Sequence, residues 1–368
     1  MTYLHTTHRL RRKLTMKKIV SMLIVLAMLV AGVSAFAAEM KVALITDVGN
    51  IDDKSFNQSA WEGVVAFGDE NKIAYEYYRP SEDSTIARVE SMKTAIENGA
   101  TTLVCPGFLF EDSVYEVQKD YPEVDFLILD GTPHSADYSD YYTAPNTSCI
   151  LYHEEQAGYF AGYAAVKDGY TKLGFLGGME VPAVQRFGFG FVQGADAAAK
   201  EMGVEVEVKY WYSGVFVPND DIKNKMAAWN SEGTEVVFAC GGGIYLSALA
   251  AAEEANTVLI GVDKDQAFES ERIITSAMKD LTNSVVLALT SLSENGGVWP
   301  ETLGGQTATL GVADDCVGLP TAEASWRMSN YTVDEYKALY EQVKSGEVVV
   351  SAELTAPAVT NVTVDYQN

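Results

Sequence analysis

An alternation of short apolar runs with helical patterns covers most of this 368-residue chain and limits the folds that it can adopt. The runs are rich in β-branched and aromatic residues, which is typical of strands, and the segments between them fit helices. Strands separated by single helices form right-handed βαβ units, so the pattern predicts an α/β fold with parallel sheets flanked by helices. We expect strands at 41–46, 73–78, 101–105, 124–129, 148–151, 171–176, 205–212, 235–240, 257–262 and 272–278, and helices near 55–70, 84–98, 111–121, 153–168, 185–202, 220–231, 243–255, 281–295 and 332–345.

The predicted strands fall into two groups of five. A polar loop rich in turn residues, "GTPHSADYSDYYTAPNTS" at 131–148, ends the first group. Two similar groups predict two lobes. We expect lobe 1 at 39–150 with roughly 280–310 returning to it, lobe 2 at 151–279 with roughly 311–350 returning to it, and a C-terminal tail at 351–368.

The N-terminal segment 1–38 has the features of a cleaved signal peptide. Basic residues precede an apolar run at 19–33, and the small residues of "SAFAA" follow. The run is short for a membrane span. We therefore expect an exported protein, with an uncleaved anchor as the alternative.

The charge and the histidine content disfavour several classes of protein. The formal net charge of −25 becomes −31 without segment 1–38, which holds six basic residues and no acid. Such a surface repels nucleic acid and anionic lipid. Only His134 and His153 lie outside that segment, so a Ser-His-Asp triad or a multi-histidine metal site is poorly supplied. We expect no catalytic residue, metal or cofactor.

The four cysteines lie far apart and include no CxxC pair, which disfavours a zinc site. Cys105 and Cys240 end apolar runs and are predicted to be buried thiols. A disulfide stays open as an alternative because the chain is expected to be exported.

Unusual residues follow the predicted strands at their carboxyl ends. Ligands of open parallel sheets bind outside these ends, so two lobes facing one cleft would place the residues around one ligand. The positions are Asp47, Cys105 to Gly107, Asp130, Gly177 and Gly178, Gly214 to Phe216, Gly241 to Gly243, Asp263 and Lys279.

The stretch "LITDVGNIDDKSFNQSAWEG" at 44–63 does not match known metal loops. Counted from Asp47, the third and fifth positions of a calcium EF-loop would be Gly49 and Ile51, which supply no side-chain oxygen. The calcium loop of nucleoside hydrolases, D-x-D-x-G-x-D-D, would need an aspartate at Ile45. A nucleoside hydrolase therefore stays only as an alternative.

The same stretch predicts the start of a helix. Ser55 and Gln58 fit an S-x-x-Q capping box, which places the start near Phe56. Phe56 could belong to the core, but its place in the first turn beside Asn57 favours the cleft.

Three glycines in "CGGGIYLSALAAAEEA" at 240–255 lie between a strand and a helix. Glycines there either let a ligand approach backbone N–H groups or form a tight turn. Neither this stretch nor "GFGFVQG" at 188–194 has the dinucleotide spacing G-x-G-x-x-G. Asp130 and Asp263 end apolar strands, where they would serve a ligand or cap a helix.

The sequence resembles the basic membrane protein family of ABC-transporter substrate-binding proteins, of the purine-nucleoside receptor type, over roughly 41–350. The resemblance implies the two-lobed type I periplasmic-binding-protein fold, with the ligand in the cleft between the lobes. The motifs are "DVGNIDDKSFNQSAWEG", "FLILDG", "YHEEQAGYFAGYAA", "KLGFLGGMEVPAVQRFGFGFVQGA", "WYSGVF", "GGG", "IGVDKDQ" and "ITSAMK".

The resemblance also implies roles for individual residues. Phe56 and Phe216 would sandwich a purine, and Asp47 and Asn57 would meet the edge of the base. The ribose would be held by Asp130, Asp263, Lys279 and a backbone N–H of Gly241, Gly242 or Gly243. Stacking clamps an aromatic base, and carboxylates accept hydrogen bonds from a diol.

Two features depart from the family pattern. The signal segment ends in "AFAAEM" without a lipobox cysteine, which leaves membrane anchoring open, and "YWYSGVFVPNDD" replaces the commoner G-[ST]-F-x-D. The resemblance implies a non-enzymatic receptor, which we expect to be monomeric, that delivers a nucleoside to a permease in the periplasm or at the outer face of the membrane. A binding protein for a sugar or a flavin on the same fold is the further alternative.

Overall fold

Two mainly parallel β-sheets organise residues 40–367, the part of the chain that the computed structural model describes. The predicted signal peptide at 1–38 lies outside the described residues. The first sheet has the strand order β11-β5-β4-β3-β1-β2, with every neighbouring pair parallel. Its strands are β1 (Lys41–Ile45), β2 (Ala74–Tyr78), β3 (Thr102–Pro106), β4 (Asp125–Leu129), β5 (Thr147–Tyr152) and β11 (Gln306–Leu310).

The second sheet has the order β12-β10-β9-β8-β6-β7-β13. Only the pair β10 and β12 is antiparallel among these strands. The strands are β6 (Lys172–Gly177), β7 (Val206–Tyr212), β8 (Val236–Cys240), β9 (Val258–Asp263), β10 (Ile273–Lys279), β12 (Val317–Gly318) and β13 (Val362–Gln367).

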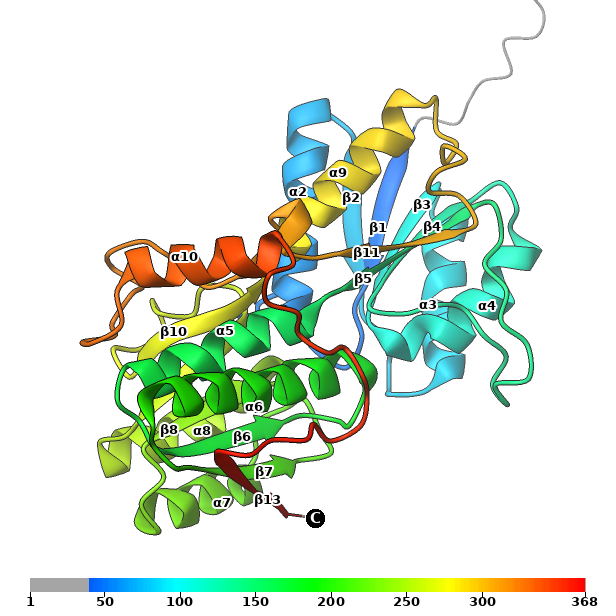
Figure 1. The fold of residues 1–368 in the computed structure, drawn as a ribbon. Helices are drawn as coiled ribbons and strands as arrows, with labels where there is room; N and C mark the ends of the chain where they lie inside the picture. Colours follow the sequence, from blue (N-terminus) through cyan, green and yellow to red (C-terminus); the bar gives the residue numbers. More distant parts are fainter. Residues whose placement is uncertain (1–39, 368) are drawn as a thin grey trace, which may run out of the picture. The chain divides into compact units, whose positions relative to one another are not determined.

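Helices flank both sheets (Figure 1). We use lobe 1 for the first sheet with α2 (Phe56–Asn71), α3 (Thr85–Glu97), α4 (Glu111–Asp120) and α9 (Leu281–Glu294). Lobe 2 is the second sheet with α5 (Glu154–Lys167), α6 (Pro182–Met202), α7 (Asp220–Ser231), α8 (Tyr245–Ala255) and α10 (Val333–Lys344). Short 3₁₀ helices are η1 (Phe108–Phe110), η2 (Gly242–Ile244) and η3 (Val312–Asp314).

The predicted α/β class with parallel sheets is confirmed, and every predicted strand and helix is present within a few residues of its expected bounds. Three strands were not predicted: β11, β12 and β13. The chain passes from one sheet to the other after β5, after β10 and after β11. Segment 351–368, expected to be a tail, contributes β13, which lies parallel to β7 at the edge of the second sheet.

Glycines bring α5 and α6 into close contact. A Cβ atom on Gly158 would lie 2.1 Å from the carbonyl oxygen of Phe187, and one on Gly162 would lie 2.0 Å from that of Phe191. A Cβ atom on Gly190 or Gly194 of α6 would lie 2.1 or 1.9 Å from a backbone oxygen of α5. No larger residue fits at these distances, so Gly158, Gly162, Gly190 and Gly194 serve helix packing rather than phosphate binding.

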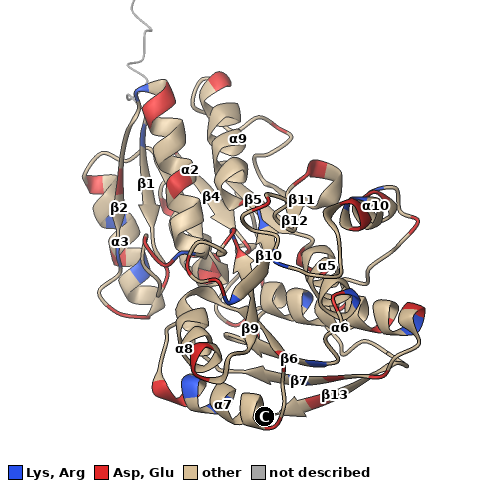
Figure 2. Ribbon diagram, turned by 90° about the vertical axis from the view of Figure 1, so that its left-hand side faces the viewer, with Lys and Arg blue, Asp and Glu red and all other residues tan. Residues whose placement is uncertain are grey.

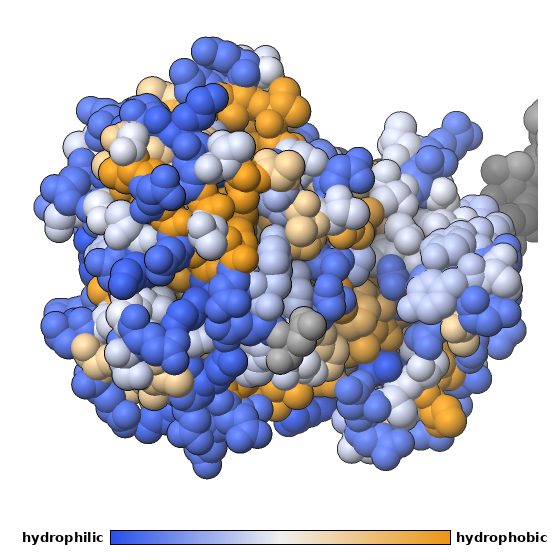
Figure 3. Space-filling model, turned by 60° about the horizontal axis from the view of Figure 1, so that its bottom comes forward, coloured by the Kyte–Doolittle hydropathy of each residue, from blue (hydrophilic) through white to orange (hydrophobic). Residues whose placement is uncertain are grey.

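The surface carries the acidic excess that the composition predicts. Figure 2 shows Asp and Glu on the helices and loops of both lobes, with fewer Lys and Arg between them. Figure 3 shows that hydrophilic residues cover most of one face and that hydrophobic ones reach the surface between them. Among residues 40–367, no helix has the length and apolarity needed to cross a membrane.

Candidate functional site

Loops at the carboxyl ends of strands from both lobes line one pocket. The space between its lining atoms, including the part open to solvent, measures about 700 Å³. The ten residues for which the resemblance implies a role all lie in its wall. They are Asp47, Phe56, Asn57, Asp130, Phe216, Gly241, Gly242, Gly243, Asp263 and Lys279.

Asp47 and Asn57 form a hydrogen-bonded pair in lobe 1. Asp47 lies two residues after β1, and its Oδ1 accepts from Asn57 Nδ2 at 2.8 Å and from the Gly49 N–H at 2.6 Å. The Asp47 N–H donates to Asn57 Oδ1 at 3.3 Å. Burial raises the pKa of Asp47 to about 6, although these hydrogen bonds favour its ionised form. The pair presents a fixed set of polar atoms to the pocket.

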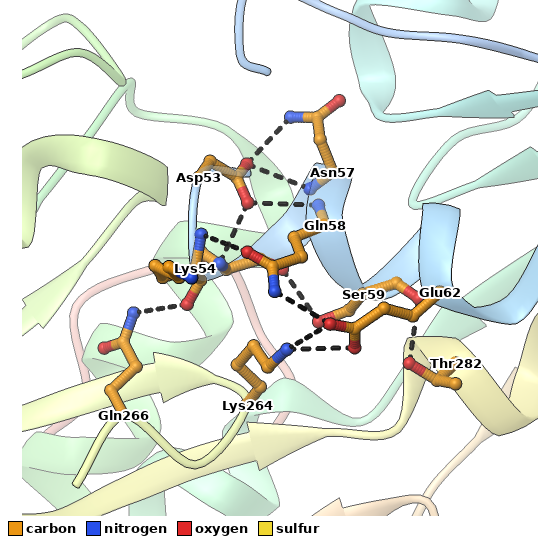
Figure 4. A network of polar contacts seen from close by, with 10 residues as sticks. Asp53, Lys54, Asn57, Gln58, Ser59, Glu62, Lys264, Gln266 and Thr282 are labelled. Atoms are coloured by element: carbon orange, nitrogen blue, oxygen red, sulfur yellow. Dashed lines mark hydrogen bonds and ion pairs between the residues drawn. The ribbon is translucent and has the colours of Figure 1, made fainter. Parts of the chain in front are cut away.

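The predicted capping box at the start of α2 is wrong, although the helix does begin at Phe56. The Ser55 side chain makes no cap hydrogen bond. Asp53 takes that role: its Oδ1 accepts from the N–H groups of Ser55 and Gln58, and its Oδ2 accepts from the Asn57 N–H (Figure 4). A carboxylate satisfies several free N–H groups at a helix start and suits the helix dipole. The Ser55 hydroxyl is thereby free to donate across the pocket.

Ser55 reaches the opposite lobe. Its Oγ donates to Asp263 Oδ2 at 2.5 Å, and both side chains are buried. Burial raises the pKa of Asp263, against the opposing effects of Lys279 and of this hydrogen bond. Sequence reasoning read Ser55 as a local cap and so missed this contact.

Lys279 lies at the centre of a buried ionic cluster. Its Nζ donates to Asp130 Oδ2 and, at 3.2 Å, to Glu154 Oε1. Arg186 Nε donates to Glu154 Oε2 at 2.6 Å. Burial disfavours the charged form of Lys279, but Asp130, Glu154 and Asp263 outweigh it and raise the Lys279 pKa. The lysine therefore stays protonated at neutral pH.

Glu154 and Arg186 were not among the predicted site residues. Glu154 is the first residue of α5, and Arg186 lies in the second turn of α6. The close glycine packing of these two helices brings the side chains together. Burial raises the pKa of Glu154, but Lys279 and Arg186 outweigh it and leave the pKa lowered. The adjacent acids of "YHEEQ", placed after a buried strand, were the available signal.

Asp130 keeps one oxygen without a protein partner. Its Oδ1 is buried and forms no hydrogen bond among the described residues, although Oδ2 accepts from Lys279. Burial raises the pKa of Asp130 to about 7, with Lys279 acting in the opposite direction. Asp130 and Asp263 both adopt a left-handed backbone, with φ of 57° and 65°. Such strain in non-glycine residues concentrates at functional sites.

The two phenylalanines enter the pocket from opposite lobes. Phe56 is the first residue of α2, and Phe216 lies in the loop after β7. Gly178 makes room for Phe216, because a Cβ there would lie 2.4 Å from two carbons of the ring. The Gly243 N–H donates to the Phe216 carbonyl at 2.9 Å, which fixes the loop and leaves Gly241 and Gly242 as the candidate ligand donors.

The four cysteines are free and buried, which confirms the prediction for Cys105 and Cys240. Within residues 40–367, no cluster of three or more His, Cys, Asp or Glu side chains could hold a metal ion.

The comparisons with known proteins identify a family. A family model described as "ABC transporter substrate-binding protein PnrA-like" (Bmp) matches residues 40–353. A nucleoside-binding protein of an ABC transporter, BmpA of Lactococcus lactis, is 30% identical over 243 residues. That alignment covers 62% of this chain and 65% of the relative, slightly under two thirds of its length.

Further relatives agree over longer stretches. Basic membrane protein A1 of Borrelia garinii is 31% identical, in an alignment that covers 67% of this chain and 70% of the relative. Basic membrane protein B of Borreliella burgdorferi is 26% identical, and that alignment covers 87% of this chain and 89% of the relative. An ABC-transporter solute-binding protein of Aeropyrum pernix superposes with a TM-score of 0.71 at 21% identity, covering 85% of this chain and 94% of that one. The fold is thus that of periplasmic solute-binding proteins, and the chain belongs to the Bmp family of PnrA-like ABC transporter substrate-binding proteins.

Proposed function

We propose that this protein is an extracytoplasmic, non-enzymatic receptor that binds a nucleoside between its lobes and delivers it to the permease of an ABC importer. Among nucleosides we propose a purine nucleoside, as the family resemblance implies. The observation that carries the proposal is the pairing of two aromatic rings from opposite lobes with buried carboxylates in one pocket. The family and the name of the Lactococcus lactis relative agree with it.

Each part of such a ligand has a matching group. Phe56 and Phe216 offer faces for a flat base, since π-faces stack on any purine. The Asp47–Asn57 pair offers oxygen acceptors to the edge of the base, because Asn57 Nδ2 already donates to Asp47 Oδ1 and to Asp53 Oδ2. The unpaired Asp130 Oδ1 offers an acceptor to a ribose hydroxyl. A buried carboxylate without a donor is costly, so a polyhydroxylated ligand would relieve it.

The pocket also suits a ligand without a phosphate group. Asp130 and Asp263 lie in its wall, and Lys279 is already engaged by Asp130 and Glu154. A phosphate would meet these carboxylates at short range in a poorly solvated space. We therefore propose nucleosides rather than nucleotides as ligands.

The decisive experiment is mass spectrometry of the small molecules released from freshly purified protein, followed by calorimetry. Inosine, guanosine and adenosine are titrated beside the free base, inosine monophosphate, glucose and riboflavin. The proposal expects a released nucleoside and binding of at least one titrated nucleoside. Binding of only glucose or riboflavin would move the function to the sugar or flavin alternative. Cation-dependent release of free base would instead make the protein a hydrolase.

A further inference from the structure

Four residues that do not line the pocket join the two lobes beside it. Lys264 Nζ of lobe 2 donates to both carboxylate oxygens of Glu62 in lobe 1, at 2.9 Å each. Gln266 Nε2 of lobe 2 donates to the backbone oxygen of Lys54 in lobe 1, also at 2.9 Å. We name these four residues, Lys54, Glu62, Lys264 and Gln266, the latch (Figure 4).

Two of the latch side chains, Glu62 and Gln266, are held in place by their own lobes. Gln58 Nε2 donates to Glu62 Oε1 at 2.7 Å, one turn earlier on α2. Gln266 is buried, and its Oε1 accepts from the Val262 N–H at 3.1 Å while its Nε2 crosses to lobe 1. Side chains that are already oriented lose little entropy when the lobes meet. The contacts should therefore stabilise the closed arrangement of the lobes.

The latch is continuous in sequence with the pocket wall. Lys54 precedes Ser55 and Phe56, and Lys264 follows Asp263. Lys54 and Asp263 both have a left-handed backbone, with φ of 56° and 65°. Forming the latch thus holds in place the segments that carry Phe56 and Asp263, although no latch atom belongs to the pocket wall.

We infer that the latch residues are positioning residues, which stabilise the closed arrangement of the lobes and raise the affinity for any ligand of the pocket by the same factor. The inference takes its ligand from the proposed function, but closure itself can be measured without a ligand. If only the closed form binds ligand, the apparent affinity equals the intrinsic affinity multiplied by the fraction of molecules that are closed.

The ion pair offers the cleanest test because it is partly exposed. The Lys264 and Glu62 side chains are 28% and 43% exposed, so charge reversal does not bury a new charge. The variants are Glu62→Lys, Lys264→Glu and the double reversal. Glu254→Lys is the matched control, since Lys223 and Glu254 form an ion pair of 2.7 Å within lobe 2. Circular dichroism establishes that each variant is folded.

Two measurements are made on each protein. The first is the distance between spin labels at exposed positions of α3 and α7, one in each lobe, in the absence of ligand. The second is the affinity and dissociation rate for inosine and 2′-deoxyinosine. We expect each single reversal to increase the population of open molecules. The affinity for both ligands should fall by the same factor, about two- to fivefold for an exposed pair, because both dissociate faster. The double reversal restores both values, and the control changes neither.

Unchanged distances in the single variants, or a double variant that stays open, would overturn the inference. A change in the ratio of the two affinities would also overturn it, because that result would place the pair in ligand recognition. If no nucleoside binds the wild type, the proposed function fails, and the label distances still decide whether the latch exists.

Discussion

At the scale of single residues, the pocket combines aromatic faces with carboxylates whose pKa values are raised by burial. Asp47 and Asp130 have pKa values raised to about 6 and about 7, and the Asp263 pKa is raised as well. Such groups are stable only when donors surround them. Ligand hydroxyls and the edge of a base supply donors, which links the electrostatics of the site to its proposed ligand.

The aromatic pair makes the first prediction. Phe56→Ala and Phe216→Ala should each weaken nucleoside binding by about 1–3 kcal/mol, because each removes one stacking face. Leu replaces the ring without stacking and should lose nearly as much, which separates stacking from simple burial. Isothermal titration calorimetry provides the measurement. Normal binding by both alanine variants would return the two phenylalanines to a structural role.

The second prediction concerns the ribose. If Asp263 accepts from the sugar hydroxyls, a 2′-deoxynucleoside leaves it partly unsatisfied at a cost of about 1–3 kcal/mol. The wild type should then prefer inosine to 2′-deoxyinosine by about one to two orders of magnitude. Asp263→Ala removes the acceptor and should shrink the preference. Calorimetry of both ligands on both proteins isolates the coupling, and a variant that keeps the full preference would remove Asp263 from the site.

The third prediction concerns pH. Lowering the pH from 8 to 5 protonates Asp130 and then Asp47, so binding should weaken as these acceptors are lost. The ligand-free fold should respond in the opposite direction. Because the folded pKa of each carboxyl lies above its unfolded value, the folded state binds more protons between pH 4 and 7, and these two groups favour unfolding as pH rises.

Calorimetric binding and urea unfolding between pH 5 and 8 measure the two effects. Asp130→Asn is the control, because the affinity of this variant for nucleoside should depend little on pH above pH 6. Affinity that is independent of pH in the wild type would contradict the assignment of these carboxylates to ligand binding.

At the scale of elements, the glycine contact between α5 and α6 brings Arg186 to Glu154, which also accepts from Lys279. Gly162→Ala should lower the free energy of unfolding by about 1–3 kcal/mol, because the new Cβ would lie 2.0 Å from the Phe191 carbonyl oxygen. The higher helix propensity of alanine alone would raise the free energy of unfolding by up to about 1 kcal/mol. A decrease therefore indicates that the steric clash dominates, and an increase that it does not. Urea unfolding measures it, with Thr94→Ala on the exposed face of α3 as control.

The predictability of the elements follows from burial. The central strands β3, β4 and β8 are fully buried and have continuous apolar runs, which the sequence shows plainly. β11 is an edge strand, "QTATL", with no buried residue, and β12 has two residues, so neither has a readable pattern. β13 gains its place from pairing with β7 and from the bond between Trp229 Nε1 and Gln367 Oε1, which no local pattern encodes.

The candidate site shows the same division. Residues at strand ends, such as Asp130 and Asp263, could be found because topology brings the ends of parallel strands together. The bond from Lys279 to Glu154 of α5 and the bond from Ser55 to Asp263 depend on how helices and lobes pack. Such contacts join positions over a hundred residues apart, and spacing in the sequence does not report them.

At the scale of the whole molecule, the pocket belongs to neither lobe alone. Ligand contacts from both lobes should favour a closed state through motion at the three connections between the sheets. Small-angle scattering should show a smaller radius of gyration when nucleoside is added. The change should be larger in the Glu62→Lys variant, whose ligand-free form is more open. An unchanged radius at saturation in both proteins would argue against closure on ligand.

The four buried cysteines have a practical consequence for such measurements. Burial raises the pKa of Cys149 to about 12 and of Cys316 to about 11, and it also raises the pKa values of Cys105 and Cys240. Thiols react as thiolates, so maleimides should leave all four untouched in the folded protein. A single cysteine introduced on the surface would then be the only point of attachment for a dye. The native chain could thus become a fluorescent sensor for its own ligand without removing any of its cysteines.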